Sequence, residues 1–352
     1  AIPDQVAHLF PDSVLVGKSF GVVRAPLEGV FMDVATFRKD LSYSDGRRPD
    51  AVSFTDPVTD AQRRDFTINA MFFDPLTDRI LDYVGGQTDI EAHIVRFVGD
   101  PNARILDDHL RMLRAVRFAS TLGFALDPAT REAIREHAAL ISRVSAERIR
   151  DALTRLLVES RSAGQALAVL DDLRLLEVIL PEVAAMKGQQ QPPEFHPEGD
   201  VFQHTVLMLD RMEERSQDLA WAVLLHDVGK PVTARSAPDR LRFDGHAERG
   251  AEMAKDILRR LRFANDSIEA VTQCVLNHMR MLSVRQMKQS TLRRLVGAPT
   301  FPLDLELHRL DCLASHGNLV NHEFLLEFSR HVAAEPVLPP PWVKGGDIMA
   351  LG

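Results

Sequence analysis

Cysteine is scarce in this sequence: the 352 residues contain two, Cys274 and Cys312. Two cysteines cannot build a disulfide framework or a cysteine-rich zinc site, and their scarcity fits a reducing compartment. No apolar run reaches the ~20 residues of a membrane-spanning helix, and the first residues lack the pattern of a signal peptide. We therefore expect a cytoplasmic protein with no membrane partner.

An excess of positive charge is also missing, since the net charge is −8. A protein that is basic all over is excluded, and contact with a nucleic acid would need a local basic zone. One lies at residues 104–155, where ten arginines and no lysine stand against seven acidic residues. The alternative is an exposed helix face whose charges pair within the helix.

The length and the 45% apolar content allow two or three globular domains. Short apolar segments between turn signals predict strands at 14–16, 21–23, 30–36 and 71–73. From residue 106 the apolar residues recur with a helical period, which predicts helices at 129–139, 146–159 and 162–176. The expected fold class is α+β, with a sheet-containing head followed by helical domains.

Breaks in these patterns suggest the domain boundaries. Residues 187–197, with three glutamines and three prolines, interrupt the helical pattern and predict a linker, and a proline-rich stretch follows the second helical region. We predict a head at 1–100, a helical neck and body at 101–186, a linker at 187–200, a second helical domain at 201–335 and the start of a tail at 336–352.

Two arginine-rich runs point to nucleotide binding. In Arg63-Arg64-Asp65-Phe66-Thr67-Ile68-Asn69, two guanidinium groups can each meet the oxygens of a triphosphate through paired donors. In Asp107-Asp108-His109-Leu110-Arg111-Met112-Leu113-Arg114, the spacing of Asp108 and Arg111 predicts one face of a helix. A carboxylate that accepts beside a guanidinium that donates can match the Watson–Crick edge of a base.

These runs resemble the bacterial class II tRNA nucleotidyltransferase and poly(A) polymerase family. Asp82-Tyr83-Val84-Gly85-Gly86 is similar to the family's head–neck hinge, and Ser145-Ala146-Glu147-Arg148-Ile149-Arg150 to its helix-supporting motif. The resemblance follows the family's order along the whole chain. It implies a polymerase-β-like head with a mixed sheet, followed by an all-α neck and body.

The resemblance also implies roles for single residues. Arg64, Asp65 and Asn69 would contact the triphosphate and ribose of the incoming nucleotide. Asp108 and Arg111 would pair with the base of CTP or ATP beside Arg114, while Glu147 and Arg148 would brace their helix. The polar stretch 40–60, with Asp45-Gly46-Arg47-Arg48-Pro49, resembles the loop associated with the switch from C to A addition. An ordinary surface loop is the alternative.

Asp33 is the expected catalytic carboxylate, because it stands alone in an apolar strand and matches the family's third acid. The alternative is an acid on the solvent face of the strand. The family's Gly-Gly-x-Val-Arg-Asp loop and Asp-x-Asp pair, which hold Mg²⁺ for nucleotidyl transfer, do not occur here. We therefore expect a fragment, truncated at both ends, that does not add nucleotides by itself.

A second set of residues predicts a metal site, in the order His204, His226-Asp227, His246, His278, Asp311. Imidazole and carboxylate ligands suit Mn²⁺, Fe²⁺, Ni²⁺ or Zn²⁺ more than Mg²⁺, and this order resembles the HD phosphohydrolase superfamily. Lys230 would hold a substrate phosphate, and His196 and Glu198 would line the pocket. The expected ligands are His204, His226, Asp227 and Asp311 for one ion, with His246 and His278 completing a second position.

The leading hypothesis is a template-independent RNA 3′-end nucleotidyltransferase, acting on tRNA with ATP and CTP, that carries an HD phosphohydrolase domain. A second hypothesis is an HD phosphohydrolase whose front half is a nucleotide- or RNA-binding relic. A third is a non-catalytic RNA- or nucleotide-binding protein. The sequence leaves open the oligomeric state, the HD substrate and the choice among CCA addition, A addition and poly(A) tailing.

Overall fold

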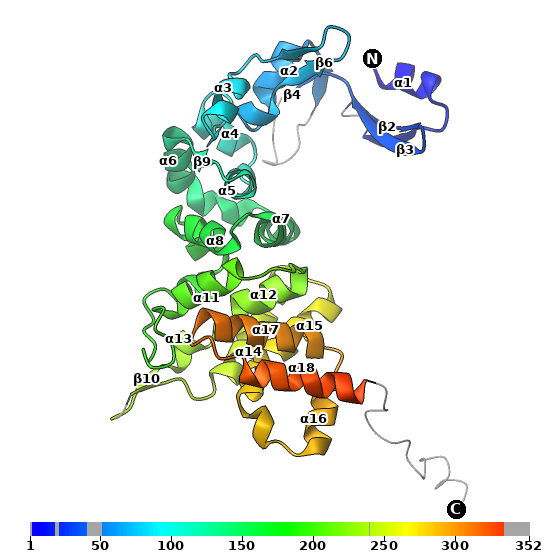
Figure 1. Ribbon diagram of the computed structural model, residues 1–352. Coiled ribbons are helices and arrows are strands. Elements are labelled where there is room, and N and C mark those ends of the chain that lie inside the picture. The colour runs from blue at the N-terminus through cyan, green and yellow to red at the C-terminus, as the bar shows by residue number, and fades with distance from the viewer. Residues whose placement is uncertain (1, 18–20, 41–50, 239, 334–352) are drawn as a thin grey trace, which may run out of the picture. The chain divides into compact units, whose positions relative to one another are not determined.

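The computed structural model describes residues 2–17, 21–40, 51–238 and 240–333 (Figure 1). The chain divides into two compact units. The first comprises Ala1–Leu156 and Val169–Ile179, and the second comprises Leu157–Ala168 and Leu180–Gly352. The predicted loop residues Asp45 to Pro49 and the predicted tail at 336–352 lie outside the described residues.

The first unit begins with a small antiparallel sheet in the order β1-β2-β3, comprising Val14–Gly17, Val22–Leu27 and Val30–Ala35. Glu28 and Gly29 both have positive φ, 49° and 83°, as a two-residue turn between twisted strands requires. One face of β2 turns Val23 and Ala25 towards Val6 of α1 (Pro3–Leu9). The alternation leaves Arg24 on the other face of the sheet.

The remaining strands of the first unit form separate pairs. The antiparallel pairs are β4 with β5, Arg38–Asp40 and Val52–Phe54, and β6 with β7, Phe72–Asp74 and Arg79–Leu81. The parallel pair is β8 with β9, Ile94–Val95 and Ala125–Leu126.

Capping residues define the first helices of this unit. Asp56 accepts the backbone N–H of Thr59 and starts α2 (Pro57–Arg63), with proline at its first position. Stacked Phe66 and Phe97, with ring centroids 5.1 Å apart, are buried in the core behind the first arginine run. The other helices are α3 (Gly86–Glu91), α4 (Pro101–Asp107), α5 (Arg111–Leu122), α6 (Pro128–His137) and α9 (Leu175–Ile179), with short 3₁₀ segments at Thr67–Asn69 and Ala138–Arg143. Two more helices, α7 (Ala146–Glu159) and α8 (Ala163–Asp172), contain residues of both units.

The second unit is helical around α12 (Gln217–Leu225), whose residues 219 to 225 are all buried. It contacts α11 (Val201–Asp210), α15 (Asn265–Asn277) and α17 (Phe301–Ala314). The other elements are α10 (Pro181–Ala184), α13 (Lys230–Thr233), α14 (His246–Arg260), α16 (Gln289–Val296), α18 (Val320–Val332), the 3₁₀ segment His278–Gln286 and the strand pair β10 (Arg235–Ser236) and β11 (Leu241–Arg242).

The α+β class is confirmed, and the predicted strands and helices lie close to the observed ones. The helix predicted at 162–176 is wrong in one respect, because it ends at Asp172 and Arg174 has a φ of 63°. That left-handed conformation interrupts a helix. In the described part of the chain, no helix combines the length and the apolar character needed to cross a membrane.

Candidate functional sites

Two acids, Asp65 and Asp60, contact arginines of the two arginine-rich runs. Asp65 accepts from Arg111 Nε at 2.7 Å and from Arg114 Nε at 2.6 Å, one carboxylate oxygen each. Arg64 Nε lies 3.1 Å from Asp60 Oδ2, and its Nη1 donates to the carbonyl of Asn69 at 3.0 Å. Arg63 joins these two groups of contacts, because its carbonyl accepts from Arg111 Nη2 at 3.3 Å and its side chain shares Asp60 with Arg64. The two runs therefore form one arginine network.

Arg111 is the most constrained member of this network. Its side chain is 7% exposed, and it also donates to the carbonyl of Arg104 at 2.9 Å and to Asp107 Oδ2 at 3.2 Å. Such contacts fix the plane of the guanidinium group, and they replace the water that a buried charge loses.

Asp108 and Arg111 do not share a helix, so the prediction from their spacing is wrong. Asp108 follows the last residue of α4 in an extended conformation, whereas Arg111 begins α5. Asp108 Oδ1 accepts the backbone N–H of Leu110 at 3.0 Å, and this local bond favours the break between the helices.

The other oxygen of Asp108 is held from α7. Arg148 Nη2 lies 2.6 Å from Asp108 Oδ2. This contact has the geometry expected of a supporting residue, while the neighbouring Glu147 is exposed in the first turn of α7.

Asp33 lies on the exposed face of the small sheet. Its Oδ1 lies 2.8 Å from Arg24 Nε of the neighbouring strand, and the two side chains are 56% and 47% exposed. The bond from Arg24 lowers the pKa of the Asp33 carboxyl. This placement agrees with the alternative of an acid on the solvent face of a strand, and the catalytic role of Asp33 stays a prediction.

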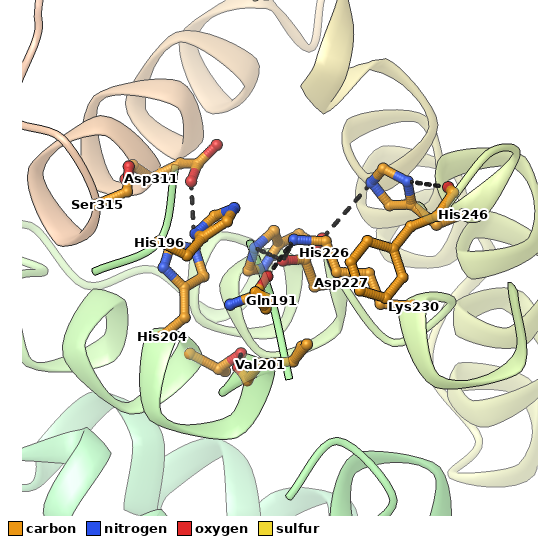
Figure 2. Close-up of polar contacts among 12 residues, drawn as sticks. Gln191, His196, Val201, His204, His226, Asp227, Lys230, His246, Asp311 and Ser315 are labelled. Atoms are coloured by element: carbon orange, nitrogen blue, oxygen red, sulfur yellow. Dashed lines mark hydrogen bonds and ion pairs between the residues drawn. The ribbon is translucent and has the colours of Figure 1, made fainter. Parts of the chain in front are cut away.

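In the second unit, three predicted ligands from three helices meet. His226 directly follows α12, His204 lies on α11 and Asp311 on α17, and each offers an atom within 4.8 Å of the others. His204 Nε2 lies 3.2 Å from Asp311 Oδ1, and Figure 2 shows these side chains facing one another.

A second group forms around Asp227. Its Oδ1 lies 3.7 Å from Nε2 of His246 and 3.7 Å from Nε2 of His278. Its Oδ2 lies 3.1 Å from His226 Nε2 in the first group. The carboxylate of Asp227 thus stands between the two groups, with one oxygen towards each.

The donor set fits divalent metal ions. Nδ1 of His226, His246 and His278 each lies 2.6–2.8 Å from a backbone carbonyl, so each ring presents Nε2 towards the centre. Burial lowers the pKa of His278 to about 4, which leaves it neutral as a metal ligand must be. The buried Nε2 atoms of His204 and His226 have no partner with hydrogen-bond geometry, and bound metal would satisfy them.

Lys230 is buried beside these groups. Its Nζ lies 2.6 Å from Asp227 Oδ2 and 2.6 Å from Gln191 Oε1. Gln191 was not predicted, and it comes from the segment predicted as a linker. The same segment supplies Glu198, which contacts His204 Nδ1 at 2.5 Å and His196 Nδ1 at 2.9 Å. The pair His196 and Glu198 was a signal in the sequence, whereas nothing marked Gln191.

Three family descriptions match successive parts of this chain. They are "Poly A polymerase head domain" at residues 1–96, "Probable RNA and SrmB- binding site of polymerase A" at residues 123–187 and "HD domain" at residues 200–315. Head and HD domains of these kinds generally use divalent metal ions.

Curated relatives and a solved structure agree with these matches. An A-adding tRNA nucleotidyltransferase of Deinococcus radiodurans is 36% identical over 312 residues, which is 83% of this chain and 70% of that protein. A CCA-adding enzyme of Bacillus subtilis is 38% identical over 239 residues, 68% of this chain and 56% of that protein. The crystal structure of the Bacillus stearothermophilus CCA-adding enzyme in complex with CTP superposes with a TM-score of 0.70 at 25% identity, covering 99% of this chain and 76% of that one.

Proposed function

Because this chain belongs to the bacterial tRNA nucleotidyltransferase and poly(A) polymerase family, we propose that the whole protein adds nucleotides to RNA 3′ ends without a template. The acceptor would be the 3′ end of tRNA, with ATP and CTP as donors. The observation that carries this proposal is the 36% identity to an A-adding tRNA nucleotidyltransferase across 83% of the chain. We also propose the predicted boundaries, with the head at 1–100, the neck and body at 101–186 and the HD domain at 201–335.

In this proposal the arginine network prepares the nucleotide site. Asp65 and Asp107 hold Arg111, and Arg148 holds Asp108, so the two groups assigned to the base do not have to be ordered when the nucleotide arrives. Arg64 and Asn69 would serve the triphosphate and ribose, with Arg114 and Glu147 beside them. Mg²⁺ bound by Asp33 and further carboxylates would supply charge neutralisation at the phosphates.

Substitution of Arg111 tests this assignment. In the full-length protein, Arg111→Ala should weaken discrimination between CTP or ATP and the other nucleotides by about 1–3 kcal/mol, because a lost donor leaves its partner unpaired. Competition among the four nucleotides during tRNA extension measures the change. Arg249→Ala is the control, since Arg249 is exposed on α14 of the second unit and pairs with Glu252. Unchanged selectivity in Arg111→Ala would remove the base-reading role.

We further propose a metal-dependent phosphohydrolase activity for the second unit. The observation that carries it is the position of Asp227 between two groups of ligands, His204, His226 and Asp311 on one side and His246 and His278 on the other. Mn²⁺, Ni²⁺ or Fe²⁺ suits such nitrogen and oxygen donors, and would activate water when bound. Lys230 would attract the phosphate, and Glu198 would keep Nε2 of His204 available as a ligand atom.

Hydrolysis of a 2′,3′-cyclic nucleotide tests this activity. Protein supplied with Mn²⁺ should open the cyclic phosphate, and Asp227→Ala should abolish the reaction because it removes the carboxylate shared by both groups. Glu252→Ala is the control, since Glu252 is an exposed acid on α14 of the same unit and pairs with Arg249. Full activity in Asp227→Ala would refute the proposal.

A further inference from the structure

A cavity of about 440 Å³ opens beside the HD ligand groups. Its volume lies in the range of about 300–1,000 Å³ found for small-molecule sites. Its lining includes two sets of side chains, beside other polar groups. One set belongs to the metal groups, namely Asp227, His246, His278 and Asp311, and the other comprises Phe195, Arg240, Phe243, Met279 and Leu282.

Phe195 and Arg240 form a pair at this cavity. The guanidinium carbon of Arg240 lies 5.4 Å from the ring centroid of Phe195, a distance at which a cation is attracted to an aromatic face. Phe195 precedes α11 and Arg240 precedes β11, so separate segments supply the two partners. Phe195 nevertheless remains 47% exposed. The packing of the unit therefore does not account for a phenylalanine at this place.

The metal groups with Lys230 suit the phosphate of a ligand, and the pair of Phe195 and Arg240 suits a planar group of the same ligand. Bound metal and Lys230 would attract a phosphate group, but inorganic phosphate has no planar face for the ring of Phe195 to stack on. A nucleobase has a planar face, and such faces stack on phenylalanine and arginine irrespective of the base. Met279 and Leu282, 42% and 48% exposed, add apolar surface.

We propose that Phe195 and Arg240 form a base subsite, so that this cavity takes a nucleotide whose ribose carries the phosphate. The placement of the phosphate rests on the hydrolase activity proposed above, whereas the base subsite rests on the contact between Phe195 and Arg240. Stacking predicts weak preference among the four bases and strong preference for a base over none.

Binding to the full-length protein, supplied with Mn²⁺, tests the subsite. Adenosine 3′-monophosphate is the nucleotide probe, and glycerol 2-phosphate is the probe that lacks a base. Phe195→Leu should weaken binding of adenosine 3′-monophosphate about tenfold and leave glycerol 2-phosphate unchanged, because leucine keeps the apolar contact and loses the stacking face. Arg240→Gln should weaken the same probe severalfold.

Matched variants control for general effects. Phe73→Leu changes another exposed phenylalanine, on β6 of the first unit, and Arg249→Gln changes an exposed arginine that pairs with Glu252 on α14. Both should bind the probes as the unaltered protein does. Hydrolysis of 2′,3′-cyclic AMP gives a second readout, in which Phe195→Leu should raise KM about tenfold with kcat changed less than about twofold.

The outcomes separate this inference from the proposed activity. If the protein binds both probes equally, or if Phe195→Leu and Arg240→Gln leave the nucleotide affinity unchanged, the base subsite is refuted even when hydrolysis is observed. If binding depends on the base and on Phe195 but no cyclic nucleotide is hydrolysed, the hydrolase proposal fails and the base subsite stands.

Discussion

Gly229 lies where two backbone segments of the HD domain approach one another closely. It follows His226-Asp227 by two residues and faces the start of α14, which carries His246. A Cβ atom at Gly229 would lie 2.2 Å from the carbonyl oxygen of His246 and 2.7 Å from the backbone nitrogen of Gly250. Van der Waals contact needs roughly 3.5 Å, so Gly229→Ala would have to displace α14 by about 1 Å.

Both obstructing atoms belong to a helix backbone, which cannot rotate away as a side chain can. We therefore expect Gly229→Ala to destabilise the second unit by about 3 kcal/mol, the upper end of the usual cost of overpacking. His246 would move away from Asp227, and hydrolysis should fall by about 100-fold, as displacements near 1 Å can cause.

Gly250 provides a matched control on the other side of the same contact. A Cβ atom there would meet Gly229 N at 3.4 Å, Val275 Cγ1 at 3.5 Å and the carbonyl oxygen of His226 at 3.6 Å, which are ordinary contacts. Gly250 is inside α14, where alanine is more favourable than glycine by about 0.5–1 kcal/mol. Gly250→Ala should therefore be neutral or slightly stabilising.

Urea unfolding followed by tryptophan fluorescence distinguishes the two variants. Trp221 is buried in α12 and reports on this unit, and a Trp342→Phe background leaves it as the only tryptophan, since the sequence contains two. A Gly229→Ala protein as stable and active as its parent would refute the close approach. Equal destabilisation by Gly250→Ala would show that the contact is tighter than the distances indicate.

Two further predictions concern the half-buried turn at Asp82 and the metal groups. Asp82 accepts hydrogen bonds from four backbone N–H groups, those of Val84, Gly85, Gly86 and Gln87. Burial by itself raises the pKa of the Asp82 carboxyl. The four bonds outweigh burial, so the pKa lies below the ordinary 3.8. The four bonds therefore stabilise the folded state above pH 3.8, and this stabilisation is lost as the pH falls further. Asp82→Asn should have a lower free energy of unfolding at pH 7 and should lose less of it on acidification. The same dependence of stability on acid pH in both proteins would contradict this prediction. Mn²⁺ titration should find two ions per chain, with His204→Ala and His278→Ala each removing one and Asp227→Ala weakening both, and a single ion in the unaltered protein would refute the two-group arrangement.

The fold and the close approach of the six predicted ligands could be predicted because their signals are local in the sequence. Short apolar strands, capped helices and the adjacent His226-Asp227 pair at the end of an apolar helix each reflect a constraint that a few neighbouring residues impose. All six predicted ligands lie in the two groups, although helix packing brings them together. Their residue types were informative because a buried histidine or aspartate requires a partner or a metal.

Partner choice among charged residues was not predictable in the same way. The spacing of Asp108 and Arg111 satisfied a helical rule, but a local bond from Asp108 to Leu110 ended one helix, and Arg111 started the next. Arg111 instead contacts Asp65, which is 46 residues away in the sequence. Many acids compete for each arginine along a chain, and tertiary structure selects among them.

The segment 187–200 shows why composition can mislead about function. Prolines and glutamines correctly excluded a regular helix between 187 and 200, and we interpreted the segment as a linker, with His196 and Glu198 expected to line the pocket. Gln191 contacts Lys230, and Glu198 contacts both His196 and His204. Phe195 lines the cavity. An irregular segment can follow the surface of a site and present successive side chains in different directions, because it is not bound to a helical or strand period. If the base subsite is correct, this segment contributes both to the support of a metal ligand and to the choice of substrate, so shortening it should impair hydrolysis even with all six ligands intact.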